Sequence, residues 1–106
     1  MQIRWFSEAI QDLTEVRKYI AKDKPLTAQD VAKRIVEEIA LLKNHPGMGR
    51  PGRVEGTREL VIPGLPYIIP YRVRNNIIEL LRVLHAARIW PKELILSLHK
   101  VHNRVF

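Results

Sequence analysis

The chain has 106 residues, 46% of them hydrophobic, which predicts one globular domain and argues against intrinsic disorder. It contains no cysteine, and this excludes a disulfide framework and thiolate chemistry. The sequence has no apolar run of about 18 residues and no signal-peptide pattern at its N-terminus, so we expect a cytoplasmic protein without a membrane-spanning helix.

The formal net charge of +7 is distributed unevenly along the chain. Residues 1–49 carry 8 basic and 7 acidic side chains, whereas residues 50–106 carry 10 basic and 4 acidic side chains. Eight of those ten basic residues are arginines, whose planar guanidinium groups suit phosphates and carboxylates. The C-terminal half therefore favours an acidic or polyanionic partner.

The N-terminal half predicts a strand followed by two helices. Residues 2–6 are rich in apolar side chains and short, as in a strand. Residues 8–23 show amphipathic helical spacing with Ser7 as the N-cap, and residues 26–44 show the same spacing with Thr27 as the N-cap. Because only a few residues separate the two helices, we expect an antiparallel hairpin whose apolar stripes need a sheet to cover.

Residues 46–57 predict a loop. Gly47, Gly49 and Gly52 match the spacing of a dinucleotide-binding fingerprint, but that motif needs a strand before it and a helix after it. Here a helix comes first and Pro51 lies inside the motif, so we reject a dinucleotide site.

Three further strands are predicted at residues 58–62, 67–74 and 77–85. Asn75 and Asn76 lie between the last two strands, and asparagine tolerates the positive φ that a two-residue hairpin turn requires. The last two strands therefore form a β-hairpin.

This turn sets the register of the hairpin and the side chains on each face. It places the following residues opposite each other: Val73 and Ile78, Arg72 and Glu79, Tyr71 and Leu80. One face is then apolar, with Tyr67, Ile69, Tyr71, Val73, Ile78, Leu80 and Leu84. The other face is half polar and partly open, with Arg72, Arg74, Glu79 and His85, and with Ile68, Leu81 and Val83 between them. Arg82 falls on the apolar face, so either its head reaches solvent at the edge or a bulge shifts the register.

The C-terminal segment, residues 91–106, starts with a proline that suits the first turn of a helix, and its apolar spacing predicts a short terminal helix. Residues 1–106 thus read as a single α+β domain of order β-α-α-β-β-β followed by this segment. A four-stranded, mainly antiparallel sheet packed against the helical hairpin satisfies both apolar stripes.

Few residues have the context of a catalytic site. The serines lack a nucleophile motif, the carboxylates are scattered, and no cluster completes a metal site, so we expect neither metal nor cofactor. His85 lies near Arg88 and is either a general acid or base or a hydrogen-bonded residue at the edge of the sheet. What remains is an arginine surface suited to contact phosphates or carboxylates, with Arg72, Arg74, Arg82 and Arg88.

Several segments, taken in order, resemble the RelE/ParE toxin superfamily. They are the first strand with Ser7 and Ala9, the pair Gly49-Arg50, and residues 58–64, 67–73 and 81–88. The resemblance covers nearly the whole chain up to Pro91. It implies a type II toxin that is held inactive by a small antitoxin encoded beside it, and it implies the same β-α-α-β-β-β fold.

The superfamily resemblance implies one of two activities. RelE-like members cut mRNA in the ribosome with strand lysines and arginines and a tyrosine or histidine, whereas ParE-like members poison DNA gyrase. The positions of those basic groups are apolar here, at Leu60, Val61, Ile62 and Ile68, and Arg88 alone matches. An apolar side chain cannot stabilise a pentavalent phosphate, so the resemblance favours the ParE-like branch and with it a gyrase poison rather than a catalyst.

We therefore expect a toxin, of the kind associated with plasmid stabilisation, that inhibits DNA gyrase, alone or with its bound DNA. An acidic, partly disordered antitoxin neutralises it. One alternative is a ribosome-dependent mRNA endonuclease with His85 and Arg88 as its catalytic residues, and a second is a non-toxic binding module. The expected target contacts are Arg72, Arg74, Arg82 and Arg88, and the expected antitoxin contacts are Trp5, Leu13 and Trp90.

Overall fold

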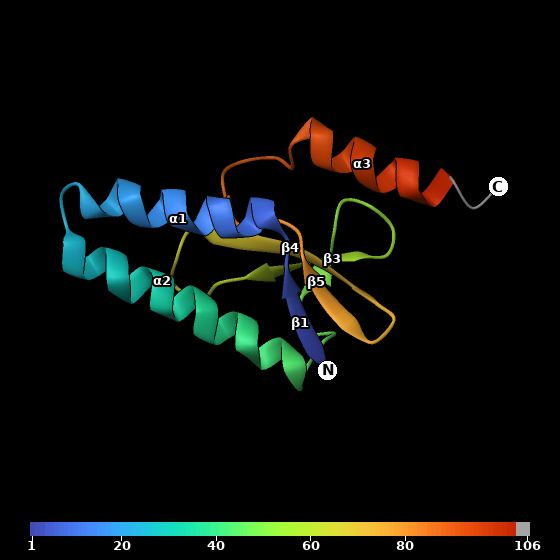
Figure 1. Ribbon diagram of the computed structural model, residues 1–106, viewed down its shortest axis with the longest axis horizontal. Coiled ribbons are helices and arrows are strands. Elements are labelled where there is room, and N and C mark those ends of the chain that lie inside the picture. Colours follow the sequence, from blue (N-terminus) through green and yellow to red (C-terminus); the bar gives the residue numbers. More distant parts are fainter. Residues whose placement is uncertain (104–106) are drawn as a thin grey trace.

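The computed structural model describes the backbone of residues 1–103 and the side chains of residues 1–99. In this part of the chain, two helices pack on one face of a sheet and a third helix packs on the other (Figure 1). The elements are β1 (Gln2–Trp5), α1 (Ser7–Ala21), α2 (Pro25–Ala40), the 3-10 turn η1 (Leu41–Lys43), β2 (Arg50–Pro51), β3 (Thr57–Val61), β4 (Tyr67–Arg74), β5 (Ile77–Leu80), β6 (Leu84–His85) and α3 (Lys92–Asn103). The α+β fold and the terminal helix are confirmed, and residues 104–106 of the predicted C-terminal segment lie outside the described residues.

The strands form one mixed sheet in the order β1-β5-β4-β3-β2, and β6 pairs with β4 off this path. β1 runs parallel to β5, and the other paired strands are antiparallel. The sheet therefore contains the predicted strands and one more, β2, which the glycine-rich loop sequence did not reveal. No helix among the described residues is long and apolar enough to cross a bilayer.

The hairpin between β4 and β5 has the predicted turn and register. Asn75 and Asn76 have φ values of 52° and 63°, as a two-residue primed turn requires. Arg72 pairs with Glu79, and the neighbouring pairs agree with the expected register. The turn sequence alone therefore fixes which side chains share a face along this part of the sheet.

A bulge interrupts the last predicted strand, residues 77–85, and divides it into β5 and β6. Tyr71 pairs with Leu80, but Ile68 pairs with Leu84, so residues 81–83 lie opposite only two residues of β4. The extra residue shifts the register by one and exchanges the faces beyond it. The prediction that Leu84 joins the main apolar face, and Val83 and His85 the polar face, is therefore wrong.

The predicted helix caps are also wrong. α1 begins at Ser7, with Phe6 at the N-cap, and the Ser7 hydroxyl donates to Glu8 instead of capping the helix. α2 begins at Pro25, with Lys24 at the N-cap, so Thr27 lies within the first turn. Proline suits the first helical position because it has no backbone N–H to leave unpaired.

The main core lies between the helical hairpin and the sheet. It contains Ala9 of α1, Val31, Ile35 and Ile39 of α2, and Leu42, Leu60, Ile62, Tyr67, Ile69, Tyr71, Ile78, Leu80 and Val83. α2 supplies three of these buried side chains, whereas α1 supplies one and otherwise packs half-buried residues against the core. Val73, expected in this core, is 38% exposed because it lies near the turn of the hairpin, at the end of the sheet.

A second, smaller core fills the opposite face of the sheet, which we expected to be partly open. It contains Val54, Ile68, Leu81, Leu84, Trp90 and Leu98, with Phe6, Leu94 and Ile95 at its margin. Because α3 contributes three of these nine residues, the terminal helix is what covers this face. The sheet therefore has apolar cover on both faces, with polar side chains around the second core.

Candidate functional site

Three charged side chains lie together on the face of the sheet that α3 covers. The Nε atoms of Arg72 and Arg74 donate to the same Glu79 oxygen, over 2.7 and 3.1 Å. The Arg72 guanidinium also lies 5.9 Å from the centre of the Phe6 ring. The Arg72 side chain is 12% exposed and that of Arg74 is 48% exposed. The cross-strand ion pair expected from the register is therefore present, and Arg74 is the more accessible of the two arginines.

Glu79 makes the stability of the fold depend on pH in the acid range. Burial alone raises the pKa of Glu79, but the hydrogen bonds and charges of Arg72 and Arg74 outweigh it and hold the pKa below its ordinary value of 4.5. A carboxylate with a lowered folded-state pKa stabilises the fold above its unfolded-state pKa, and that contribution is lost as the pH falls through the folded-state value.

We expect Glu79→Gln to lower the free energy of unfolding by about 1–3 kcal/mol at pH 7, since two charged hydrogen bonds to a buried carboxylate weaken. The difference from the wild type should shrink as the pH falls through the lowered folded-state pKa of Glu79. Urea unfolding at pH 7 and pH 3.5 measures both effects. An equal difference at the two pH values contradicts the assignment.

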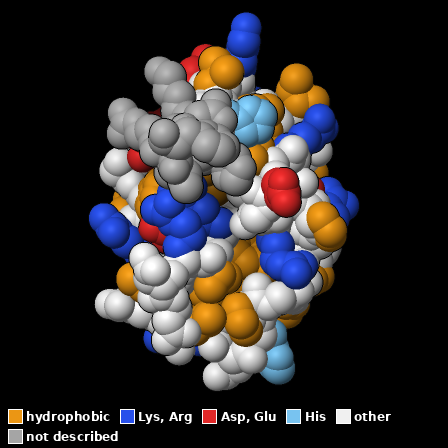
Figure 2. All heavy atoms as spheres, turned by 90° about the vertical axis from the view of Figure 1, so that its right-hand side faces the viewer, with side chains coloured by type: hydrophobic (Ala, Val, Ile, Leu, Met, Phe, Trp, Pro, Cys, Tyr) orange, Lys and Arg blue, Asp and Glu red, His pale blue; other side chains and the backbone are white. Residues whose placement is uncertain are grey.

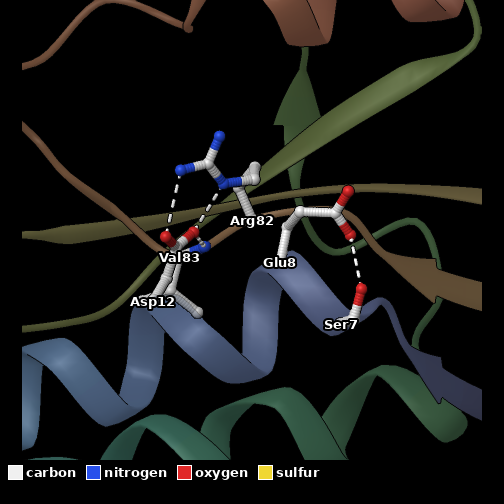
Figure 3. A network of polar contacts seen from close by, with 5 residues as sticks. All are labelled: Ser7, Glu8, Asp12, Arg82 and Val83. Carbon is white, nitrogen blue, oxygen red and sulfur yellow. Dashed lines mark hydrogen bonds and ion pairs between the residues drawn. The ribbon is translucent and has the colours of Figure 1, made fainter.

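Arg82 lies in the bulge and is tied to α1 (Figure 3). Its Nε and one terminal nitrogen donate to the two oxygens of Asp12, over 2.6 and 3.0 Å, and the backbone N–H of Val83 donates to the same carboxylate over 2.9 Å. The hydrogen bond to Asp12 raises the pKa of Arg82. Of the two alternatives for Arg82, the bulge is therefore correct, and its guanidinium is committed to the fold.

His85 is the last residue of β6, and Arg88 lies in the exposed turn that follows it. The N–H of Arg88 donates to the carbonyl of His85 over 2.9 Å, and His85 Nδ1 accepts the N–H of Ala87 over 3.2 Å. The His85 ring meets the Tyr67 ring edge to face, with centres 5.9 Å apart. His85 is thus beside Tyr67 and not beside Arg72, which projects from the other face of β4.

Three of the four apolar positions that the resemblance matches to basic side chains of the nuclease branch lie in the cores. Leu60 and Ile62 are 3% and 1% exposed in the main core, and Ile68 is 4% exposed in the second core. Val61 alone is open, at 45%, and it is apolar. These side chains hold the sheet to its helices and offer no charge to a phosphate.

The predicted antitoxin contacts do not form one surface. Trp5 is half-buried and lines a groove of about 280 Å³ with Ile3 and Val36. Leu13 is also half-buried and packs against the main core. Trp90 is 2% exposed, and its indole N–H donates to Glu59, so its ring is enclosed and not available to a partner in this structure.

Sequence reasoning missed two acidic residues that organise the arginines. Asp12 seemed to be one of several polar residues on the outer side of α1, but it binds the bulge. Glu59 looked isolated, but it accepts from Trp90 and, over 2.9 Å, from Arg50. Side chains alternate between the two faces along β3, so Glu59 lies on the same face as Thr57. This alternation was the signal in the sequence from which the face of Glu59 could have been predicted.

At the end of the molecule where the β4–β5 hairpin lies, the visible basic side chains do not form one continuous patch. Figure 2 shows blue Lys and Arg side chains spread around orange hydrophobic ones on this face. The charge excess of residues 50–106 is thus dispersed and partly neutralised by Asp12, Glu59 and Glu79. Arg88 is exposed, and no ion pair of its side chain occurs among the described residues.

Comparison with known proteins gives a consistent answer. Residues 3–90 match the family described as the ParE toxin of type II toxin–antitoxin systems, parDE. The chain is 45% identical over 93 residues to a candidate toxin, Y4kP, of Sinorhizobium fredii, covering 88% of this chain and 96% of the relative. It is 35% identical over 88 residues to toxin RelE2 of Caulobacter vibrioides, covering 83% and 98% of the two chains.

A solved structure agrees with the sequence relatives. A chain of the chromosomal ParDE toxin–antitoxin system from P. aeruginosa superposes with a TM-score of 0.75 at 30% identity, covering 80% of this chain and 95% of that one. The fold, with a helical hairpin on a mixed sheet, is thus that of a type II toxin. The chain belongs to the ParE toxin family of type II toxin–antitoxin systems, and an antitoxin is therefore its expected partner.

Proposed function

We propose that this toxin arrests growth by inhibiting DNA gyrase in the cytoplasm and that it does so by binding and not by catalysis. The observation that carries the proposal is the burial of Leu60, Ile62 and Ile68 in the two cores. A phosphoryl-transfer site needs charged or hydrogen-bonding groups aimed at the reacting phosphate. The sheet holds apolar side chains at the positions where the nuclease branch holds such groups.

The geometry of the remaining nuclease candidates supports the same choice. His85 and Arg88 share a turn, but Arg72 and Arg82 are held elsewhere by Glu79 and Asp12. A general acid or base must lie within hydrogen-bonding reach of its proton while another group stabilises the phosphate charge. One exposed arginine beside one histidine supplies at most a phosphate contact.

The target contacts that we propose are first Arg88 and Arg74, the two most accessible of the four predicted arginines, whereas Arg72 and Arg82 are less exposed and are paired with Glu79 and Asp12. Gyrase alone offers carboxylates to such a surface, and gyrase with its bound DNA also offers phosphates. Binding to the DNA-bound form should weaken with salt through counterion release.

We also propose that an acidic, partly disordered antitoxin docks on the groove that Trp5 and Val36 line. The groove lies beside β1, which is an edge strand of the sheet, and Val36 is 45% exposed. Lys43 also lines it and suits an acidic segment. Leu13 remains a predicted contact on α1.

The test is controlled induction of the toxin in cells, with and without the product of the adjacent small reading frame. Plasmid supercoiling, protein synthesis and mRNA integrity by primer extension are followed separately. We expect lost gyrase-dependent supercoiling before any fall in translation, no codon-positioned mRNA cuts, and rescue by the antitoxin. Purified toxin should inhibit supercoiling by purified gyrase.

Two results would contradict this proposal. Codon-positioned cuts in ribosome-bound mRNA that disappear in His85→Ala and Arg88→Ala would establish the nuclease alternative. Unimpaired growth at high soluble expression, with no effect on gyrase, would establish a non-toxic binding module of the same fold.

A further inference from the structure

The helix α3 lies outside the segment that matches the ParE family, because the match ends at residue 90 and α3 begins at Lys92. It nevertheless packs on the sheet face that carries the Arg72 cluster. Its apolar anchors are Leu98, which is 7% exposed, and the half-buried Leu94 and Ile95. With a single fully buried anchor in its described part, α3 has the features of a segment that opens at low free energy.

Two cavities lie between α3 and the sheet, and Leu98 lines each of them. One cavity, of about 220 Å³, is lined by Phe6, Arg72, Leu81, Arg82, Leu94 and Leu98, together with Glu8, Glu93 and Ser97. The other, of about 230 Å³, is lined by Val54, Glu55, Gly56, Thr57, Arg72, Val73, Arg74 and Leu98. Arg72 and Leu98 are the two residues that line both cavities. Removing Leu98 would therefore join them into one groove that runs from Arg82 past Arg72 to Arg74.

α3 also brings a carboxylate to this groove. Glu93 lines the same cavity as Arg82 and Arg72, where Glu8 of α1 is the other acidic group. The helix thus presents an apolar side chain over Arg72 and an acid near Arg82. These are the two kinds of group through which a partner binds a basic and partly apolar surface.

We propose that α3 is an autoinhibitory cover of the groove formed by Arg72, Arg74 and Arg82, and that the toxin engages its target fully only when α3 leaves this face. The toxin then exists in a closed form, with α3 on the groove, and an open form, with α3 away from it, and contacts of α3 with the sheet favour the closed form. The proposal builds on the target surface proposed above but does not depend on which macromolecule is the target.

The test compares Leu98→Ser with Leu96→Ser, because both change a leucine of α3 but Leu96 is 50% exposed. Arginine accessibility is measured with phenylglyoxal and peptide mass spectrometry, with the exposed Arg17 as internal standard. We expect Leu98→Ser to raise the labelling rate of Arg72 about tenfold, because losing a buried leucine anchor shifts opening by at least that factor. Leu96→Ser should label like the wild type.

The second readout is the inducer concentration that halves the growth rate, at matched soluble toxin. We expect this threshold to fall several-fold for Leu98→Ser and to stay unchanged for Leu96→Ser. Hydrogen exchange checks that β4 stays protected while α3 exchanges faster. Where Leu98→Ser loses protection in β4 as well, Leu94→Ser, at the margin of the same core, replaces it.

Each outcome decides the proposal. Greater Arg72 labelling together with stronger growth arrest supports the cover, even where gyrase is unaffected and the proposed target is wrong. Greater labelling with unchanged growth arrest shows that α3 opens without regulating the toxin and overturns the proposal. Equal Arg72 labelling in both serine variants shows that Leu98 does not cover Arg72 and overturns it as well.

Discussion

Replacing Arg88 by alanine is expected to raise the toxin level needed for growth arrest by at least about tenfold, because truncating one partner of a close charge pair typically costs more than that factor in affinity. Arg88 is exposed in the turn after β6, so its loss removes a contact without opening a core. The fold and antitoxin binding should persist. The measurement is growth after graded induction, with soluble toxin quantified in each culture.

Matched variants separate charge from position. Arg17→Ala removes an equally exposed arginine from α1 and should leave toxicity unchanged. Arg88→Lys keeps the charge without the planar fork and should retain part of the activity. Arg72→Ala should reduce toxicity less completely than Arg88→Ala, since Arg72 is already paired with Glu79. Equal toxicity of Arg88→Ala and the wild type, at equal soluble levels, contradicts this role.

Trp90→Ala is expected to lower the free energy of unfolding by about 3–5 kcal/mol, the usual effect of truncating a buried aromatic side chain. The substitution empties the centre of the second core and leaves the buried carboxylate of Glu59 with Arg50 as its remaining donor. That loss is a large fraction of the stability of an average domain, so we expect little soluble protein at 37 °C. Urea unfolding of purified protein measures the change.

Two controls identify the cause of that loss. Trp90→Phe keeps most of the packing but removes the hydrogen bond to Glu59, and it should cost about 1–3 kcal/mol. Ile89→Ala, at a neighbouring side chain that is 72% exposed, should stay within about 0.5 kcal/mol of the wild type. If Trp90→Ala unfolds at the same urea concentration as Ile89→Ala, the second core contributes little to stability.

The features predicted correctly from the sequence are local ones. Asn75 and Asn76 determine a turn geometry by themselves, and the register of Arg72 with Glu79 follows from it. The helical hairpin follows from apolar spacing and a short connection in the same way. In each case the residues that decide the structure are neighbours in the chain.

The features that the sequence did not determine depend on distant partners. The bulge at residues 81–83 is held by Asp12, which lies about seventy residues earlier in the chain. The sequence of the strand alone therefore could not decide between a regular register and a bulge. Trp90 was assigned to a partner surface because its acceptor, Glu59, and the other residues of the second core lie in other elements. Such contacts are set by tertiary packing, which overrides local propensity.

The pairing of β1 with β5 has a consequence for how the toxin is made. Gln2 lies beside Ile77 and Trp5 beside Leu80, so the first strand of the chain has no place in the sheet until the hairpin has been synthesised. Contacts between such distant segments slow folding, because a long loop must close before the pairing stabilises it. A nascent toxin on the ribosome therefore cannot complete its sheet until residues 77–80 have been synthesised, which is late in the synthesis of the chain.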